Sequence, residues 1–517
     1  MRGFLLTPIL SVFVLPWGLP VPEGTEDLMT SDYSFVQRVQ DEEQKLIASD
    51  ASGTDNFGFS VALSGDRALV GAHLVGTNGE FQSGAAYVFE RVDGAWVETA
   101  TLTAPDAARS DNFGTSVALD GDRAFVGATA TAIRPGAVYV FDWAAGSWTL
   151  SQKLTAPDAQ PGDEFGISVS LDGDRALIGA HQNGTETNTR EGAAYVFDLA
   201  GGTWTQTQKL TATDAAVGDG FGISVSLDED RALIGASRGE PNDNGSAYVF
   251  DLVSGSWSET QKLSARNTMP LDYFGISVSL DGDRALIGAY GDDPGEGGNY
   301  GSAYVFDFSS GTWSETTKLT ATDGESTDWF GFAVALDGGR ALVGDWADNT
   351  DRGDRVGSAY VFDLVDGRWS ESVYLEASDA LQGEQLGISV ALDGNRALVG
   401  ANSADIGIEI NAGAAYSYTL PDPVANEDAA DRAVTLTVAP NPVASHGTVT
   451  LELTEAADVT VALYDALGRE VAQLAEGPYS AGRHSLALAT DDLPVGVYVI
   501  RAQLGNTVCT TRLTVVR

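Results

Sequence analysis

The chain has 517 residues, of which 73 are Asp or Glu and 29 are Lys or Arg, and its formal net charge at pH 7 is -44. Such an acidic surface repels phosphate backbones and anionic lipid headgroups, which argues against nucleic acid as a ligand. Sixty glycines, few helix-forming runs and this length favour an all-β protein with more than one domain.

The first residues have the features of a secretory signal peptide. Arg2 precedes an apolar run from Phe4 to Leu15, which is too short to span a bilayer comfortably, and a stretch containing Pro and Gly follows. We therefore predict a signal peptide over residues 1–22, with a buried apolar strand as the alternative. The single cysteine, Cys509, leaves no partner for an intrachain disulfide.

A unit of 52 to 56 residues recurs seven times within residues 33–419. Each copy contains a Phe-Gly pair, or Leu-Gly in the seventh, and the pairs begin at Phe57, Phe113, Phe165, Phe221, Phe274, Phe330 and Leu386. Repetition at a nearly fixed period is typical of a repeat architecture.

Each copy contains four short runs with β-strand character. In the third copy these runs are residues 165–171, 175–179, 193–197 and 204–210, and Asp172-Gly173 forms a tight hairpin turn between the first two. Four strands per unit, without a helical period, predict blades around an axis. The predicted fold is therefore a seven-bladed β-propeller of four-stranded antiparallel blades.

The outer strand of the blade predicts how the ring closes. A tryptophan begins this strand in six copies, at Trp96, Trp148, Trp204, Trp257, Trp313 and Trp369. The seventh copy ends after Tyr418 without such a strand, whereas Gln44-Lys-Leu46, before the first copy, matches Gln152-Lys-Leu154. The N-terminal strand is therefore predicted to complete the last blade, so that no blade lacks its outer strand.

These repeated residues resemble the FG-GAP repeat of the seven-bladed propeller in integrin alpha chains, and more closely the bacterial form of that repeat. The resemblance covers residues 35–419 and implies the same propeller fold. Two features differ from the family pattern. Gly-Ala is not followed by proline, and the sixth copy has Gly344-Asp345 instead. A tight Asp-Gly-Asp-Arg turn replaces the family's Asp-rich calcium loop, so its calcium sites are not carried over.

Sequence variation among the copies is concentrated in the loops between the second and third strands, which should emerge on one face of the ring. The fifth and sixth of these loops combine aromatic and acidic residues, which would suit a sugar ring or a bound cation. The candidate ligand-binding residues are Tyr290, Asp292, Asp293, Tyr300, Trp346, Asp348, Asp351 and Asp354. The alternative is that these acidic, Gly-rich loops are simply solvated.

Acidic pairs precede nearly every Phe-Gly pair. Their side chains can accept hydrogen bonds from the amides of their own turn, which requires no metal. The alternative is that the carboxylate oxygens bind calcium. The weak candidates for metal binding are Asp106, Asp111, Asp158, Asp163, Asp214 and Asp219. No other cofactor is indicated. An arginine also follows the hairpin turn in every copy and is predicted to form ion pairs between blades.

The C-terminal part of the chain predicts a second domain. Residues 420–433 are rich in Pro and acidic residues and predict a solvated linker, and residues 434–517 alternate strands with Gly-containing turns, as in a small immunoglobulin-like β-sandwich. Ala439-Pro-Asn-Pro442, Val461 to Arg469 and Leu493 to Tyr498 resemble the C-terminal sorting domain of the type IX secretion system of Bacteroidetes-like bacteria. The resemblance implies export through the periplasm by that machinery. An ordinary immunoglobulin-like binding module is the alternative.

We therefore expect a secreted or cell-surface propeller that binds an extracellular protein or glycan ligand, with no transmembrane span in the mature chain. Catalysis finds little support, because the four histidines are scattered and no serine lies in a nucleophile-elbow context. Two alternatives stay open. One is a carbohydrate-active enzyme, either a glycosidase or a lyase, and the other is a passive structural surface protein.

Overall fold

The computed structural model shows a chain of β-strands joined by turns and loops. It describes residues 39–423 except 41, 78, 131–133, 185–189, 239–243, 268, 294–297 and 351, and residues 434–515 except 440–445, 454–455, 466–468, 491–492, 495 and 505–506. The signal peptide predicted over residues 1–22 and most of the predicted linker lie outside the described residues.

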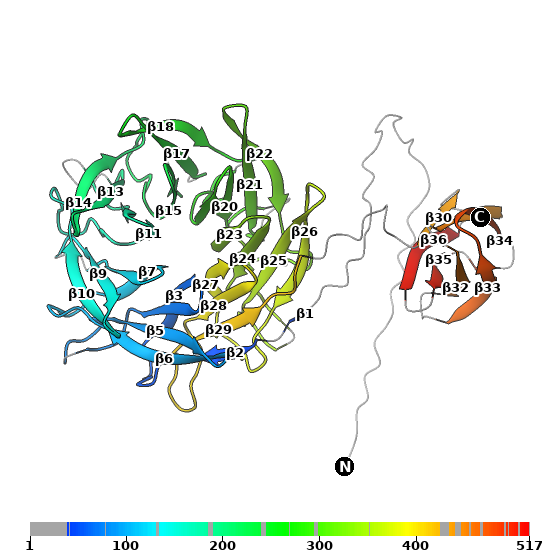
Figure 1. The fold of residues 1–517 in the computed structure, drawn as a ribbon, viewed down its shortest axis with the longest axis horizontal. Coiled ribbons are helices and arrows are strands. Elements are labelled where there is room, and N and C mark those ends of the chain that lie inside the picture. Colours follow the sequence, from blue (N-terminus) through cyan, green and yellow to red (C-terminus); the bar gives the residue numbers. More distant parts are fainter. Residues whose placement is uncertain are drawn as a thin grey trace, which may run out of the picture. The chain divides into compact units, whose positions relative to one another are not determined.

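Seven sheets, each with four antiparallel strands, surround an axis as the blades of a propeller, and one of them carries a short fifth strand (Figure 1). Blade 1 contains β3 (Phe57–Ser64), β4 (Arg67–Ala72), β5 (Ala85–Val92) and β6 (Ala95–Leu102), and blade 2 contains β7 (Phe113–Asp120), β8 (Arg123–Ala128), β9 (Ala137–Ala144) and β10 (Ser147–Leu154). Blade 3 contains β11 (Val169–Asp172), β12 (Arg175–Ala180), β13 (Ala193–Ala200) and β14 (Thr203–Leu210), and blade 4 contains β15 (Ser224–Asp228), β16 (Arg231–Ala236), β17 (Ser246–Val253) and β18 (Ser256–Leu263).

The remaining blades follow the same order. Blade 5 contains β19 (Val278–Asp281), β20 (Arg284–Ala289), β21 (Ser302–Ser309) and β22 (Thr312–Leu319), and blade 6 contains β23 (Ala333–Asp337), β24 (Arg340–Asp345), β25 (Ser358–Val365) and β26 (Arg368–Leu375), with β1 (Val39–Gln40) parallel to β26. Blade 7 contains β27 (Leu386–Asp393), β28 (Arg396–Ala401), β29 (Ala414–Thr419) and β2 (Gln44–Leu46). The second and third strands are buried along most of their length, because neighbouring blades pack on both of their faces. The predicted all-β fold of seven four-stranded blades is confirmed.

The N-terminal strand β2 is the outer strand of blade 7. It pairs antiparallel with β29, with Lys45 opposite Tyr416. Blades 7 and 1 are joined by the same contact as other neighbours: the N–H of Gly65 donates to Asp393 Oδ2 (2.5 Å), as that of Gly173 donates to Asp120 Oδ2 (2.9 Å) between blades 2 and 3. The seventh sheet is thus built from both ends of the repeat region.

Close backbone contacts between blades explain the repeated Phe-Gly and Gly-Ala pairs. Gly58 has a φ of +89°, and a Cβ atom there would lie 2.1 Å from the carbonyl oxygen of Ala414 in blade 7. A Cβ atom on Gly71 would lie 2.2 Å from the carbonyl oxygen of Gly114 in blade 2. Any side chain at these positions would force neighbouring blades apart, so the repeat requires glycine at both.

Most of the repeated arginines form the predicted ion pairs between neighbouring blades. Nε of Arg175 donates to Asp198 in its own blade (2.7 Å), while Nη1 reaches Asp230 in the next blade (2.9 Å) and the guanidinium lies 5.3 Å from the ring centroid of Trp257. Arg396 continues the series across the closure, with Nη1 2.8 Å from Asp66 in blade 1. Five of the seven arginines thus form an ion pair with the next blade, whereas Arg284 donates to the carbonyl of Gly338 in the next blade (3.1 Å) and Arg340 pairs with Asp363 of its own blade (2.7 Å).

The C-terminal domain is a β-sandwich, as predicted. One sheet has the order β30 (Val434–Ala439), β31 (His446–Leu453) and β34 (Gly482–Ala489), and the other has the order β33 (Glu470–Tyr479), β32 (Ala457–Asp465), β35 (Gly496–Leu504) and β36 (Thr507–Val515). Its core contains the fully buried side chains Val449, Leu451, Val461, Leu463, Ile500 and Leu513. These alternate along the strands, as expected where two sheets face one another.

Candidate ligand-binding site

The variable loops share one face of the ring with the loops that lead into the first strand of each blade. The N–H of Gln182 donates to the carbonyl of Asp163 (3.3 Å), and the N–H of Arg238 donates to the carbonyl of Asp219 (3.2 Å). These bonds fix both kinds of loop against each other in successive blades. The result is one continuous surface, on which the candidate site lies.

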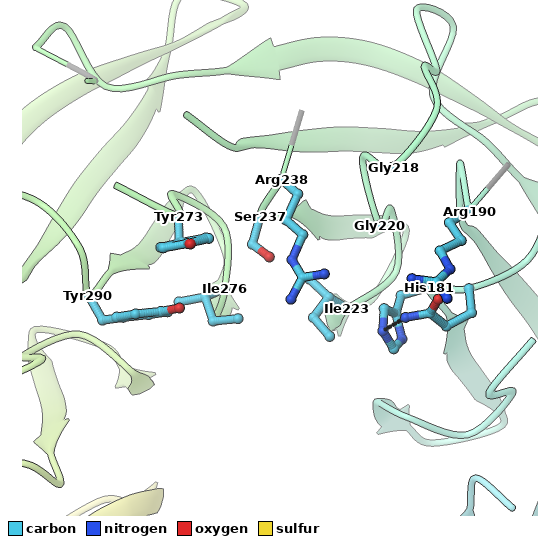
Figure 2. Close-up of a pocket in the computed structure, with 11 residues that line it drawn as sticks. His181, Arg190, Gly218, Gly220, Ile223, Ser237, Arg238, Tyr273, Ile276 and Tyr290 are labelled. Atoms are coloured by element: carbon cyan, nitrogen blue, oxygen red, sulfur yellow. Dashed lines mark hydrogen bonds between the residues drawn. The ribbon is translucent and has the colours of Figure 1, made fainter. Parts of the chain in front are cut away.

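A small pocket opens on this surface between blades 3, 4 and 5 (Figure 2). Its volume of about 60 Å³ is sufficient for a few water molecules or for one substituent of a larger ligand. In Figure 2 the side chain of Arg238 lies between Tyr273 and Tyr290 on one side and His181 and Arg190 on the other. The pocket therefore combines aromatic rings, guanidinium groups and an imidazole.

Two arginines bring positive charge to the pocket, and one carboxylate lies close by, with Glu164 Oε2 3.7 Å from His181 Nδ1. Arg190 and Arg238 are both exposed. Neither guanidinium forms an ion pair with any residue in the described part of the chain. An unpaired guanidinium presents planar donors that match the geometry of a carboxylate or a sulfate group. The pocket can therefore accept an anionic substituent.

His181 supplies a polar but uncharged contact. Burial, together with Arg238 and Arg190, lowers the pKa of His181 to about 4. The side-chain nitrogen of Gln182 lies 2.6 Å from Nε2 of His181 and must donate to it, because an amide nitrogen is not an acceptor. The ring proton is therefore on Nδ1, and the imidazole is neutral at pH 7.

Five aromatic side chains form a row that begins at the pocket and crosses blades 5 and 6. They are Tyr273, Tyr290, Trp329, Phe332 and Trp346, and we call them the aromatic row. Tyr273 and Tyr290 are stacked at 4.9 Å, and Trp329 lies 5.2 Å from Tyr290 and 4.7 Å from Trp346 between ring centroids. All five side chains are partly exposed, so the row offers apolar ring surface to a ligand.

Two members of the row have an unfavourable backbone conformation. The residue before Phe-Gly or Leu-Gly has a positive φ in all seven copies, and five copies place Asn, Glu, Gly or Gln there: Asn56, Asn112, Glu164, Gly220 and Gln385. Tyr273 and Trp329 occupy this position with φ of 56° and 68°. Bulky side chains are disfavoured in this region by about 1 kcal/mol or more. Strain at two partly exposed aromatics indicates a role other than stability.

Comparison with known proteins identifies the repeats. Seven segments match the FG-GAP repeat: residues 41–89, 96–141, 148–197, 204–250, 257–306, 313–362 and 369–418, together more than half of the chain. The chain belongs to the FG-GAP repeat family. Each matched segment begins near an outer strand and continues through the three inner strands of the next blade, so the first one includes β2.

The comparisons also identify the second domain of this FG-GAP protein. Residues 437–516 match the secretion system C-terminal sorting domain, which directs export by the type IX route to the cell surface or the medium and implies contact with that machinery. No helix in the described residues is long and apolar enough to cross a membrane.

Individual proteins add little to this identification. A similar solved structure is PorZ, a surface component of the type IX secretion system of Porphyromonas gingivalis, with 13% identity and a TM-score of 0.37 over 88% of this chain and 65% of that chain. This similarity is too low to support an argument about fold or function. No curated protein matches the chain.

The FG-GAP propeller brings two of the predicted site residues, Tyr290 and Trp346, into the aromatic row. Sequence reasoning missed Tyr273, Trp329 and Phe332. The sequence did contain a signal for them. Tyr273 and Trp329 each precede the Phe of a Phe-Gly pair, and Phe332 lies two residues after such a Phe. The pocket residues His181, Arg190 and Arg238 were also missed, since the loops 181–191 and 237–244 contain no aromatic residue.

The predicted carboxylates are placed differently from the aromatic residues. Asp292 is fully buried, with Oδ2 2.5 Å from Lys318 Nζ and 2.6 Å from the hydroxyl of Tyr304, and Asp348 is also buried. Asp293 accepts a hydrogen bond from the N–H of Gly298 (3.1 Å), Tyr300 is half-buried, and Asp354 is exposed. Asp351 lies outside the described residues.

The candidate metal ligands of the FG-GAP propeller make internal contacts in two sets. Asp111, Asp163 and Asp219 each accept a hydrogen bond from the N–H three residues earlier, at 2.7 to 2.8 Å. Asp106, Asp158 and Asp214 each accept from a tyrosine hydroxyl and pair with a lysine. Burial raises their pKa, but the lysine and tyrosine contacts outweigh it and hold the pKa of each below its ordinary value.

In the described residues, no three Asp, Glu, His or Cys side chains are grouped to hold a metal ion. The first set shows the turn-amide bonding that the sequence suggested. Calcium at these pairs stays a prediction.

His73 and His181 should make the propeller acid-sensitive. Burial lowers the pKa of both to about 4, below the ordinary value of 6.5, so the unfolded chain binds protons that the folded protein does not. This contribution to stability is complete above pH 6.5 and is lost as the pH falls through 4. In thermal unfolding at pH 7 and 4.5, the double variant His73→Thr/His181→Asn should lose less stability on acidification than the wild type. His484→Asn, in the sandwich, is the control, and equal losses in all three proteins would contradict the prediction.

Proposed function

We propose that this exported FG-GAP propeller is a binding protein for a glycan that carries a carboxylate or sulfate group. The supporting observation is that two strained aromatic residues, Tyr273 and Trp329, lie in a row that ends beside the exposed side chain of Arg238. The protein keeps this arrangement at a cost in stability, which is typical of functional sites.

The chemistry of the site supports this class of ligand. Flat aromatic rings pack against the apolar faces of sugar rings, and the row is long enough to contact more than one ring. The pocket beside Arg238 admits a single substituent and offers it guanidinium donors. Because the net charge of -44 repels polyanions at a distance, we expect a glycan with isolated rather than dense negative charges.

Trp329→Asn should weaken glycan binding with only a modest loss of stability. Asn occupies the same position in two other blades, so the variant relieves backbone strain of about 1 kcal/mol, which partly offsets the loss of two aromatic contacts worth about 0.5 to 1.5 kcal/mol each. On a glycan array, we expect the full chain to retain acidic glycans and Trp329→Asn to lose binding by roughly tenfold or more, as expected for loss of about 1.4 kcal/mol.

Two further variants sharpen the test. Arg238→Gln should weaken binding to acidic glycans while leaving uncharged analogues unaffected. Phe81→Ala removes an exposed aromatic that also lies against an arginine, Arg109, but outside the row, and should bind normally. Wild-type-like binding by Trp329→Asn would contradict the proposed site, and turnover of a retained glycan would favour the carbohydrate-active enzyme.

A further inference from the structure

The sixth blade departs from the repeat at two buried positions. Asp345 stands where the other six blades have a buried alanine after glycine: Ala72, Ala128, Ala180, Ala236, Ala289 and Ala401. Tyr374 stands where five other blades have a lysine in the outer strand: Lys45, Lys153, Lys209, Lys262 and Lys318. One substitution adds a carboxyl group, and the other removes an ammonium group.

Blade 5 shows what the ammonium group does. There Lys318 Nζ lies 2.5 Å from Oδ2 of the buried Asp292 and 5.5 Å from the ring centroid of Tyr304. Asp348 occupies the position of Asp292 in blade 6, three residues after the end of the second strand. Its Oδ2 accepts a hydrogen bond from the hydroxyl of Tyr374 (3.1 Å), which brings no positive charge. Blade 6 therefore keeps the buried carboxylate and lacks its counter-charge.

Asp345 is a buried carboxyl group without a hydrogen-bond partner. Its exposure is 0%, and neither Oδ1 nor Oδ2 has a partner in the described part of the protein. Ser358 Oγ, on the residue paired with Asp345 across the sheet, and Oδ1 of Asp328 are also buried without partners. Each unsatisfied buried oxygen costs free energy, and an unpaired buried charge costs more. Blade 5 also has two such oxygens, Asp292 Oδ1 and Ser302 Oγ, so the two oxygens of Asp345 are what distinguishes blade 6, and they indicate a bound group beside this side chain.

The backbone brings the three carboxyl groups into one part of blade 6. The N–H of Ala347 donates to the carbonyl of Asp328 (3.2 Å), and the N–H of Asp348 donates to the carbonyl of Asp345 (3.4 Å). Carboxylates held this close repel one another. No lysine or arginine in the described chain forms an ion pair with Asp328, Asp345 or Asp348. A cation would relieve both the repulsion and the unsatisfied oxygens.

We propose that blade 6 binds a calcium ion at Asp345, with Asp348, Asp328 and Ser358 as further oxygen ligands. Carboxylate and hydroxyl oxygens are the ligands that calcium prefers, and the ion would replace the lysine ammonium found in neighbouring blades. No three acidic side chains surround one point as they stand in the described residues, so the ion would draw them together and complete its shell with backbone carbonyls and water. The site lies at the end of β24, away from the turns between first and second strands.

Terbium luminescence and calcium-dependent unfolding of the full chain test this site. Terbium takes calcium's oxygen ligands, and Trp346 and Tyr374 are close enough to sensitise its emission. We expect sensitised emission that calcium displaces, and a rise in unfolding temperature on the order of 5 °C between chelator and millimolar calcium. Asp345→Ala, which restores the residue of the other blades, should abolish both responses and be at least as stable as the wild type in chelator.

A second variant and a control exclude simpler explanations. Tyr374→Lys restores the ammonium group and should also abolish both responses. Asp174→Asn removes a carboxylate with 78% exposure on the opposite face and should respond as the wild type does. The proposed site would be wrong if the wild type responded to neither terbium nor calcium. It would also be wrong if Asp345→Ala and Tyr374→Lys responded to both ions as strongly as the wild type does. Because these readouts involve no glycan, they stand apart from the proposed ligand-binding function.

Discussion

Deletion of residues 434–517 is expected to abolish export of the propeller and to leave it in the periplasm. The deleted residues include the whole segment that matches the secretion system C-terminal sorting domain. They include no strand of the propeller, because all seven blades are built from residues 39–419. The truncated chain, which ends at Ala433, also keeps the bond between Arg340 and the carbonyl of Pro421 (2.7 Å). The loss should therefore be one of transport and not of folding.

Cell fractionation with immunodetection measures this outcome. The full chain should be found at the cell surface or in the medium, and the truncated chain should be confined to the periplasmic fraction. The purified truncated propeller should unfold at the same temperature as the propeller of the full chain, which controls for misfolding. Fusion of residues 424–517 to an unrelated periplasmic protein should carry that protein outside. Normal amounts of the truncated chain outside the cell would exclude the sorting role.

The fold could be predicted from the sequence because the propeller requires particular residues at backbone contacts. Glycine is needed wherever blades approach within contact of main-chain atoms, as at Gly58 and Gly71, so every blade repeats the same pairs. The N-terminal strand was recognisable because it contains Gln44. The amide of this side chain forms hydrogen bonds with the backbone of Trp96 in the next blade (2.8 Å), and the equivalent Gln of other outer strands forms the same contact. Because the blades repeat these contacts, the residues that form them recur at a nearly fixed period and can be recognised in a single sequence.

The candidate site was predicted only in part, because the direction of a side chain depends on distant residues. The sequence shows Asp292 and Tyr290 in the same acidic loop, but Asp292 turns inward because Lys318, in the outer strand, attracts it. That pairing crosses two strands and is not visible in the loop itself. Tyr273 and Trp329 were missed for a related reason, since they belong to loops from another part of each repeat and meet the variable loops only in the folded blade.

In blade 6 the departures from the repeat proved more informative than the repeated residues. Gly344-Asp345 was visible in the sequence as an exception to Gly-Ala, but its meaning depends on Tyr374, which is far along the chain. Only the pairing of β24, β25 and β26 places the added carboxyl group near the position that has lost its lysine. The calcium site is therefore inferred by comparing equivalent positions in different blades. Neighbouring residues along the chain do not indicate it.

Leu46→Ala is expected to destabilise the propeller by about 2 to 5 kcal/mol, the usual cost of truncating a fully buried leucine. Leu46 lies in β2 with an exposure of 0% and packs in a core that includes Leu398 and Ala415 of blade 7. The same strand holds blade 7 through Lys45 and Asp379 (2.8 Å) and blade 1 through Gln44. Loosening it therefore weakens the boundary where the ring closes.

Ile47→Ala is the matched control for this prediction. Ile47 is the next residue, also a branched apolar side chain, but 41% of it is exposed, so its truncation should change the free energy of unfolding by about 0.5 kcal/mol or less. Denaturant unfolding of the full chain, followed by tryptophan fluorescence, compares the two variants with the wild type. Because only the pairing of β2 with β29 buries Leu46 and leaves Ile47 exposed, equal effects of the two substitutions would mean that the N-terminal strand does not close the ring.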